Sequence, residues 1–289
     1  MSSQSSKVAN LRLVGARGSG KTAYIASLAY LTQGPNRNLK SPIESIVSVG
    51  IDDDNQDLLN KAQNILEQGL QLEQTKKLYL SEVRNYSLQI ALKDPSFFGS
   101  QSIDLLINCK DYSGEVFTDL INNQSDSLLD KYIDDCKAAS GILLLIDGTS
   151  HLQDGFYAQG LKNFFIALDR AAQEYELKQI ACTLSKCELP ELWVNRHDPK
   201  GILTRRFPLM KRQLEVWADK PNRFVDYFAT SAFGVIGKEY PKANTKIVET
   251  TDGGTSCIIA KSEKWRPFGL VSSIYWLSTG KRHRTLDQD

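Results

Sequence analysis

The sequence predicts an α/β protein with one open, mostly parallel sheet and helices on both faces of that sheet. Three observations lead to this fold class. Short apolar runs of strand length alternate with helical patterns along most of the chain. The run at residues 140–146 is continuously apolar, as in a strand that is buried on both faces, and residues 179–184 are expected to form another buried strand. A glycine-rich loop, residues 15–20, stands between the first apolar run and the first helical pattern.

The expected strands are short, β-prone apolar runs, and the third and fourth of them are expected to pair as a hairpin. In chain order they are residues 8–14, 43–51, 86–92, 103–109, 140–146, 179–184 and 224–230. The expected helices carry apolar residues at i, i+3, i+4 and i+7 spacing, and Asp52 to Asp54 form a cap before the second. They are residues 21–33, 58–70, 120–139, 159–177, parts of 190–219, and 270–279.

The composition is typical of a globular protein, and the length allows one large domain or two small ones. Hydrophobic residues make up 41% of the 289 residues, which is enough to bury a core. The net charge of +1 provides no overall attraction to nucleic acid or to an anionic membrane. We expect a disordered leader at residues 1–7, one domain over 8–280 and a frayed tail at 281–289. Within the domain we expect a helical insertion at about 40–75, and variable insertions at about 190–220 and 237–265, the latter polar and irregular.

The cysteine and hydropathy patterns predict a cytoplasmic protein. The five cysteines are an odd number, widely scattered among apolar residues, as reduced buried thiols are. Together with three histidines they show no zinc-ligand spacing. No apolar run approaches the roughly 18–20 residues that span a bilayer, and the N-terminus has no apolar segment like that of a signal peptide.

The strongest signal of function is Gly15-Ala16-Arg17-Gly18-Ser19-Gly20-Lys21-Thr22, which fits G-x-x-x-x-G-K-[ST] between an expected strand and an expected helix. Glycines let successive backbone N–H groups turn toward a β-phosphate, and the positive end of the following helix adds to the attraction. Lys21 is expected to reach the β- and γ-phosphate oxygens, and the Thr22 hydroxyl to bind Mg²⁺. A glycine-rich turn that only starts a helix would not explain why Lys and Thr follow together. The segment therefore predicts a nucleotide-phosphate site.

A second candidate follows the expected strand at residues 103–109. Asp111 stands at its carboxyl end, where a protein with a phosphate loop holds Mg²⁺ directly or through water. Gly114, three residues later, is placed to bring a backbone N–H to a γ-phosphate. Alone, such a D-x-x-G turn is an ordinary surface feature, but its position after a strand and downstream of the glycine-rich loop favours the metal and phosphate interpretation.

Two segments at the ends of later strands are candidates for recognition of a base. In Ser185-Lys186-Cys187-Glu188 the carboxylate can accept hydrogen bonds from the N1–H and 2-amino group of guanine, while the lysine stem covers the ring. Ser231 and Ala232 are small residues that allow backbone amides to approach the base. Each segment alone would be an unremarkable strand end.

In this order the four segments resemble the motifs of P-loop GTPases of the Ras-like and translation-factor-related class. GARGSGKT resembles the phosphate loop, DYSG the D-x-x-G motif of switch II, SKCE a variant of [NT]-K-x-D, and TSA the S-A-[KL] motif. Trp265-Arg-Pro-Phe-Gly-Leu270 before the last helix is similar to a phrase in bacterial GTPase-like proteins of multi-gene systems. The resemblance covers residues 11 to about 277. It implies a three-layer P-loop fold, GTP or GDP with Mg²⁺ as ligands, and a protein partner that reads the switch loops.

The resemblance also implies further roles and exposes departures from the family pattern. Thr75 is expected to be the switch I threonine whose hydroxyl binds Mg²⁺. Glu115 stands where Ras-like members have a water-orienting glutamine, so hydrolysis is expected to be slow. Arg17 is either an internal finger toward the phosphates or a solvated loop side chain. Ser185 keeps a hydroxyl where Asn or Thr braces the loop, and Glu188 is one methylene longer than the usual Asp, which leaves the choice between guanine and adenine open.

Three functions are compatible with these residues. The first is a GTP-dependent molecular switch with slow hydrolysis, in which Lys21, Glu115 and Arg17 are the catalytic candidates. The second is an ATP-using P-loop enzyme, against which no Arg-rich lid follows a substrate helix. The third is a module that holds a nucleotide without turnover. Basic and aromatic residues interleave at 193–217, but a solvated helix face with aromatic anchors is the simpler interpretation, so we expect no nucleic-acid partner.

Overall fold

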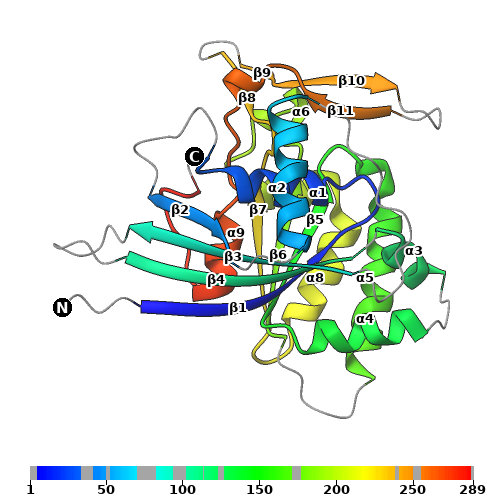
Figure 1. Ribbon diagram of the computed structural model, residues 1–289. Coiled ribbons are helices and arrows are strands. Elements are labelled where there is room, and N and C mark those ends of the chain that lie inside the picture. The colour runs from blue at the N-terminus through cyan, green and yellow to red at the C-terminus, as the bar shows by residue number, and fades with distance from the viewer. Residues whose placement is uncertain are drawn as a thin grey trace.

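The computed structural model describes residues 5–33, 42–49, 53–69, 83–93, 102–112, 114–122, 127–170, 177–237, 241–249 and 255–287. Over these residues the chain forms one large sheet, two small two-stranded sheets, and helices that cover both faces of the large sheet (Figure 1).

The large sheet has seven strands and is mostly parallel. They are β1 (Ser5–Val14), β2 (Ile43–Ser48), β3 (Arg84–Lys93), β4 (Ser102–Asp111), β5 (Gly141–Asp147), β6 (Gln179–Ser185) and β7 (Phe224–Ala229), in the order β2-β3-β4-β1-β5-β6-β7. From β4 to β7 all neighbours are parallel, whereas β3 is antiparallel to both β2 and β4. The predicted α/β fold class, including the hairpin of the third and fourth strands, is confirmed.

Helices form an outer layer on each face, and each layer packs on its own apolar core. On one face lie α1 (Lys21–Tyr30), α2 (Asp53–Leu66) and α9 (Ser272–Thr279). On the other face lie α3 (Glu115–Ile121), α4 (Ser127–Lys137), α5 (Asp154–Asp169), α6 (Pro190–Trp193), α7 (Pro199–Arg206) and α8 (Pro208–Ala218). Short 3₁₀ turns, His151–Gln153 and Ser262–Lys264, precede α5 and α9.

The alternation of side chains along β5 explains why its sequence is apolar up to Ile146. Ile142, Leu144 and Ile146 contribute to the core beneath α5 and α8. Leu143 and Leu145 contribute to the core beneath α1 and α9. Because both faces are covered, every residue of the strand is buried, as expected of a central parallel strand.

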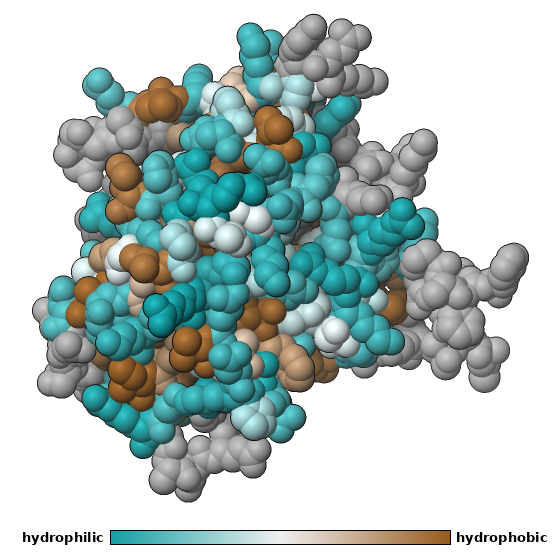
Figure 2. All heavy atoms as spheres, turned by 180° about the vertical axis from the view of Figure 1, so that it is seen from behind, coloured by the Kyte–Doolittle hydropathy of each residue, from teal (hydrophilic) through white to brown (hydrophobic). Residues whose placement is uncertain are grey.

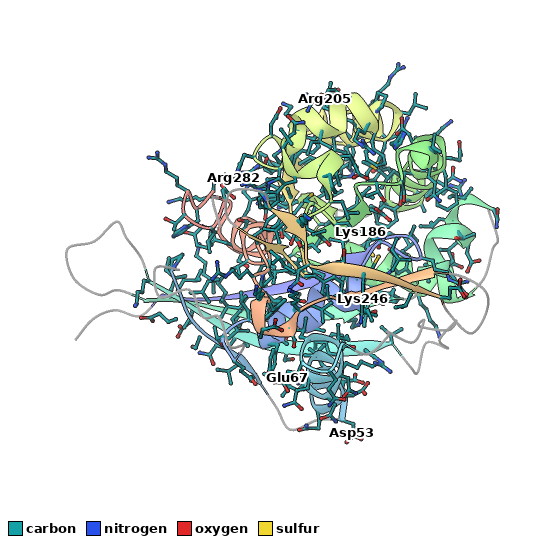
Figure 3. All side chains as sticks on the ribbon, turned by 90° about the horizontal axis from the view of Figure 1, so that it is seen from above. Asp53, Glu67, Lys186, Arg205, Lys246 and Arg282 are labelled. Atoms are coloured by element: carbon teal, nitrogen blue, oxygen red, sulfur yellow. The ribbon has the colours of Figure 1, made fainter. Side chains whose placement is uncertain are left out.

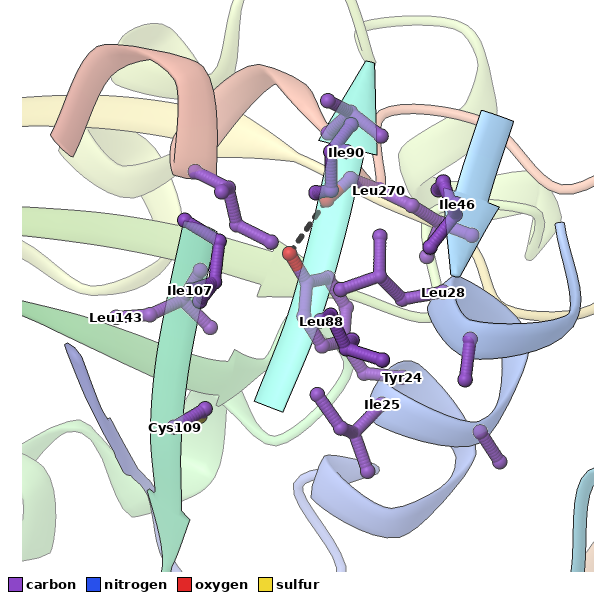
Figure 4. Close-up of a cluster of buried hydrophobic side chains, with 14 of the residues drawn as sticks. Tyr24, Ile25, Leu28, Ile46, Leu88, Ile90, Ile107, Cys109, Leu143 and Leu270 are labelled. Carbon is purple, nitrogen blue, oxygen red and sulfur yellow. Dashed lines mark hydrogen bonds between the residues drawn. The ribbon is translucent and has the colours of Figure 1, made fainter. Parts of the chain in front are cut away.

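Tyr24 joins α1 to the segment that leads into α9. Its hydroxyl donates to the Leu270 carbonyl at 2.5 Å and lies 3.3 Å from the Ser273 hydroxyl. Figure 4 shows this bond within the apolar cluster, beside Leu28 of α1 and Leu88 of β3. The helix that begins at the glycine-rich loop is therefore fixed to a part of the chain nearly 250 residues away.

A group of polar residues joins α4 to β1 and β4. Asp135 of α4 accepts hydrogen bonds from Nε and Nη2 of Arg12 at 2.5 and 2.8 Å, from Lys110 Nζ at 2.8 Å and from the Tyr112 hydroxyl at 2.5 Å. Arg12 and Lys110 are register partners in the β1–β4 pair. Burial acts to raise the pKa of Asp135, but these bonds outweigh it and the pKa lies below its ordinary value.

The chain ends differ from the expectation. β1 begins at Ser5, so residues 5–7 belong to the sheet rather than to a disordered leader. In the tail, Arg282 binds both carboxylate oxygens of Asp226 and the carbonyl of Tyr227. Leu286 is buried, and its carbonyl accepts a hydrogen bond from the Ser272 hydroxyl. These long-range contacts correct the expected frayed tail.

Internal segments differ as well. Residues 237–265, expected to be irregular, contain β9 (Lys242–Ala243), which pairs with β8 (Val235–Ile236), and the hairpin of β10 (Thr245–Glu249) and β11 (Thr255–Ile259). The expected helix at residues 120–139 is divided between α3 and α4. The insertion at about 40–75 contributes the edge strand β2 in addition to α2. Short strands of mixed polarity carry no strong period, so the sequence pattern does not predict them.

The surface is mixed in character. Figure 2 shows apolar side chains in separate groups among polar ones on one face of the molecule. Within the described residues, no helix combines the length and apolarity needed to cross a bilayer. All five cysteines are free thiols; Cys109, Cys136, Cys182 and Cys187 are buried, and Cys257 is partly exposed.

Replacing Asp135 by alanine should lower the free energy of unfolding by about 3 kcal/mol, since the buried Arg12 loses its partner. Because the pKa of Asp135 is lowered, this stabilisation is present at neutral pH and is lost as the pH falls through that lowered pKa. Urea denaturation at pH 7 measures the difference. Asp134→Ala is the matched control: it removes an exposed pair with Lys137 and should cost less than about 1 kcal/mol. Equal costs for the two variants would contradict the role of Asp135.

Candidate functional site

The glycine-rich loop connects β1 to α1 at the carboxyl edge of the parallel strands. Gly18 and Gly20 have φ values of 80° and 88°, in the left-handed region that favours glycine. A Cβ on Gly15 would lie 2.4 Å from the Leu145 carbonyl oxygen. Ser19 is fully buried, and its hydroxyl has no hydrogen-bond partner among the described residues. The shape of the loop therefore depends on its glycines.

Lys21 begins α1, and its ammonium group turns back over the loop. Nζ donates to the carbonyl oxygens of Gly15 at 2.8 Å and Ala16 at 3.3 Å. Burial lowers the pKa of Lys21, and the negative charge of Asp111 acts in the opposite direction. A poorly solvated cation of this kind gains free energy from an anionic ligand placed over the loop.

Asp111 ends β4 beside this lysine. Its side chain is buried, with 7% exposure, and in the described part of the chain its Oδ1 atom has no hydrogen-bond partner. Burial raises the pKa of Asp111 to about 6, against the opposing charges of Lys21 and Arg84. A buried acceptor without a partner costs about 1–3 kcal/mol, so this position favours a cationic ligand.

Arg84 is a residue of this site that sequence reasoning missed. It begins β3 and is the register partner of Asp111, so its charge lies beside that carboxylate. Its Nη1 atom is 2.7 Å from Asp57 Oδ2 in α2, which connects the insertion at about 40–75 to the site. The only signal in the sequence was the expected hairpin, because in an antiparallel pair the start of one strand faces the end of the other.

The loop after β4 touches the glycine-rich loop at Gly114. A Cβ on Gly114 would lie 2.4 Å from the Arg17 nitrogen and 2.8 Å from the Ala16 carbonyl carbon, so only glycine permits this approach of two backbones. Glu115 follows in the first turn of α3, Arg17 is exposed, and Thr22 lies in the first turn of α1. Thr75 lies outside the described residues.

Ser185 braces the glycine-rich loop from the end of β6. Its hydroxyl donates to the Ser19 carbonyl at 2.7 Å and lies 3.2 Å from the Ile146 carbonyl. The hydroxyl that stands in place of an Asn or Thr side chain thus contacts the loop directly. This bond links the segment expected to bind a base to the segment expected to bind phosphate.

Lys186 has a φ of 59°, and its ammonium group forms an ion pair with Asp147 at the end of β5. The other oxygen of Asp147 accepts hydrogen bonds from the Thr149 N–H and hydroxyl at 2.9 and 2.6 Å. Burial acts to raise the pKa of Asp147, but Lys186 and Thr149 lower it below its ordinary value. Asp147 was not singled out from the sequence, because Asp-Gly-Thr after a strand is typical of an ordinary turn.

Glu188 is buried against the loop that follows β7. It is 4% exposed, and Oε2 has no hydrogen-bond partner within the described ranges. Burial raises its pKa, and a hydrogen bond with the Ser231 side chain acts in the opposite direction. Ser231 N–H donates to the Phe268 carbonyl at 3.0 Å, and Trp265 Nε1–H donates to the Ala232 carbonyl at 2.7 Å. The site thus holds an unsatisfied acceptor between fixed neighbours.

The oxygen ligands beside the glycine-rich loop, at what we call the phosphate end of the site, suit a hard cation. The Thr22 hydroxyl and the orphaned oxygen of Asp111 are ligands of the kind that Mg²⁺ prefers. No group of three or more His, Cys, Asp or Glu side chains in the described segments is arranged to hold a metal ion. Magnesium bound here would therefore complete its coordination with phosphate oxygens and water.

Residues 12–189, more than half of the chain, match the family described as Double-GTPase 1. The chain belongs to the Double-GTPase 1 family. The matched range contains the glycine-rich loop, Asp111, Gly114 and Ser185 to Glu188, and it ends before Ser231 and Ala232. The resemblance to P-loop GTPases is thereby confirmed, and guanine nucleotide is the ligand that membership of a GTPase family implies.

Two solved structures are similar to this Double-GTPase 1 protein. One is a bacterial selenocysteine-specific elongation factor, EF-Sec, with 14% identity and a TM-score of 0.34 over 78% of this chain and 26% of that one. The other is Sup35 complexed with GMPPNP, with 9% identity and a TM-score of 0.36 over 78% of this chain and 38% of that one. The chain thus spans less than half the length of either protein. No curated protein matches it.

In this Double-GTPase 1 protein the predicted residues fall into two connected groups. Lys21 and Asp111 interact at the phosphate end, where Gly114 meets Arg17. Glu188 and Ser231 interact at the other end, which we call the base end, and Ser185 joins the two groups through Ser19. The ammonium group of Lys186 is paired with Asp147 at this end.

Ser185→Ala should weaken GDP binding about fivefold, because the loop loses a brace worth about 1 kcal/mol. Isothermal titration calorimetry of the purified protein measures the affinity. Ser185→Thr is the control, since it keeps the hydroxyl and should recover most of the binding. An affinity that is unchanged in Ser185→Ala would show that the bond to Ser19 does not shape the loop.

Proposed function

We propose that this Double-GTPase 1 protein is a molecular switch that binds GTP, hydrolyses it slowly with Mg²⁺, and regulates a protein partner. The observation that carries the proposal is the backbone contact between Gly114 and Arg17. A terminal phosphate bound over the glycine-rich loop would lie close to this contact. Its presence or loss would therefore change the position of residues 111–115, and with it the surface offered to a partner.

At the phosphate end, residues 15–20 supply backbone N–H groups, and Lys21 exchanges its carbonyl partners for β- and γ-phosphate oxygens. Mg²⁺, held by Thr22, Asp111 and the switch I residue Thr75, would neutralise charge on the phosphates when bound. Arg84 favours the ionised form of Asp111, which is the form that binds a cation.

The proposal that hydrolysis is slow rests on the identity of residue 115, the glutamate that follows Gly114. A carboxylate at Glu115 repels the charge of a γ-phosphate and lacks the amide donor that orients an attacking water. Arg17 lies on the exposed side of the loop and would add positive charge toward the phosphates. Faster turnover would require a group from a partner.

At the base end, Glu188 supports guanine over adenine. Its orphaned oxygen can accept from the N1–H or 2-amino group of guanine, whereas adenine presents an acceptor at N1 and leaves the oxygen unpaired. The stem of Lys186 would cover the ring while Asp147 holds its ammonium group. Ser231 and Ala232 would complete this end through their backbone amides.

Competition between a fluorescent GTP analogue and unlabelled GTP, GDP or ATP, with Mg²⁺ present, tests the proposed ligand. We expect a guanine preference of at least about tenfold, or about 1.4 kcal/mol. Lys21→Ala should weaken binding about ten- to a hundredfold, because charge-assisted bonds contribute about 1.5–3 kcal/mol. Preference for ATP would identify an ATP-using P-loop enzyme. Bound GTP without any phosphate release would identify a non-hydrolysing module.

Glu188→Gln makes the same assay more specific. The amide NH₂ donates where the carboxylate accepts, so GTP affinity should fall about tenfold or more. Affinity for xanthosine triphosphate should rise, because xanthine carries a carbonyl where guanine carries the 2-amino group. An equal loss for every nucleotide would instead assign Glu188 a purely structural role.

Gly114→Ala should reduce the difference between binding of GDP and of a non-hydrolysable GTP analogue. The added Cβ would lie 2.4 Å from Arg17 N, so residues 111–114 must move away from the glycine-rich loop. Calorimetry with the two nucleotides measures the ratio of their affinities. Gly155→Ala is the matched control, since a Cβ there meets no atom within 4 Å. Equal affinities already in the wild-type protein would refute a switch, because a ligand without differential binding shifts no population.

A further inference from the structure

The hairpin of β10 and β11 lies beside the base end of the site. The two strands are antiparallel, with Ile247 opposite Cys257 and Lys246 opposite Ile258. In Figure 1 the hairpin runs above the large sheet close to α6, the helix that follows Glu188. Figure 3, viewed from above, shows Lys186 and Lys246 in the same part of the projection, with the hairpin nearer the viewer.

Asn244 fixes the base of this hairpin to the loop that contains Ser231 and Ala232. Asn244 is fully buried, and its N–H donates to the Gly234 carbonyl at 2.9 Å. Its side chain accepts from Lys261 N–H and donates to the Lys261 carbonyl, each at 2.9 Å. Gly234 N–H in turn donates to the Ser231 hydroxyl at 2.7 Å. The position of β11 relative to the base end is therefore set by buried hydrogen bonds.

Cys257 lies in β11 of this hairpin. It packs, together with Ala232, at the margin of the apolar core beneath α1. Burial is the main influence on the pKa of its thiol and raises that pKa, while the charge of Lys186 lowers it and the charges of Glu188 and Asp147 raise it. An independent feature of the same place is the orphaned, buried oxygen of Glu188, which lacks a partner in the described part of the chain. Thiol and carboxylate thus border one site that is incomplete without a ligand.

Cys257 also differs from the other cysteines in accessibility. Cys109, Cys136, Cys182 and Cys187 are buried, and burial raises the pKa of each thiol far above neutrality. Burial raises the pKa of the Cys257 thiol as well, but this thiol is partly exposed. Because reactivity requires access, Cys257 is the cysteine that a soluble electrophile should modify in the folded protein.

We infer that the β10–β11 hairpin forms the outer wall of the nucleoside pocket and that Cys257 is a ligand-shielded modification site within that wall. The inference rests on the proposed function, since it takes guanine nucleotide as the occupant. A bound nucleoside covers the Cys257 thiol, and a group attached to that thiol occupies the space of the nucleoside. Nucleotide binding and covalent modification of Cys257 are therefore mutually exclusive.

N-ethylmaleimide provides the test on the purified full chain. The thiolate sulfur bonds to one carbon of the maleimide double bond, and the other carbon takes a proton. Mass spectrometry follows labelling of Cys257, while calorimetry on unlabelled protein establishes GDP binding separately. With GDP at about 100 times its Kd, about 1% of the protein is free, so labelling should slow about a hundredfold. Protein labelled beforehand should no longer bind GDP, whereas the same treatment should leave the binding of Cys257→Ser as it was before treatment.

The matched control is a Cys257→Ser, Lys246→Cys double variant. Lys246 lies on the same hairpin, but successive residues of a strand point to opposite faces, and it does not pair with Cys257. Its labelling should proceed at one rate with and without GDP. The inference that the hairpin forms a wall of the pocket would be overturned if GDP binds without protecting Cys257. It would also be overturned if GDP protects the cysteine at position 246 equally. Either result would leave the proposed function intact. Failure of the unlabelled protein to bind GDP would overturn the proposed function and the inference with it.

Discussion

Parallel pairing on both sides of β1 is the constraint from which the site follows. β1 pairs with β4 on one side and β5 on the other, and Leu13 is the register partner of both Asp111 and Leu143. Segments that leave one edge of a sheet in register start close together. Gly114, three residues beyond Asp111, therefore reaches Ala16, three residues beyond Leu13. That meeting leaves no room for a side chain.

The site concentrates polar groups that the rest of the fold has to stabilise. Asp111, Glu188 and Ser19 each bury an oxygen atom without a hydrogen-bond partner in the described segments. Such groups cost free energy in the ligand-free protein, of the order of 1–3 kcal/mol each. Apolar cores on both faces of the sheet offset this cost, and a ligand that supplies the missing partners recovers it. Local instability at the site and affinity for a ligand have the same origin.

Sequence reasoning predicted the fold class and the family because their signals are local. Two-sided burial makes β5 and β6 mainly apolar, and the residues expected to bind phosphate lie close together in sequence, from Gly15 to Thr22. Arg84 and Asp147 were missed because their roles arise from partners on other strands or loops. The order of the tail was missed for the same reason, since the bond of Arg282 to Asp226 spans 56 residues. The roles assigned to individual site residues remain predictions.

The tail also bears on how copies of this chain behave at high concentration. β7 is the last strand of the large sheet, and an edge strand offers unpaired backbone groups to any other extended chain. Arg282 donates a hydrogen bond to the Tyr227 carbonyl and lies over the Phe228 ring, so that its charge stands beside the strand. A neighbouring strand would have to displace an ion pair before it could add to this edge. The tail around Arg282 therefore opposes the addition of another strand to the β7 edge.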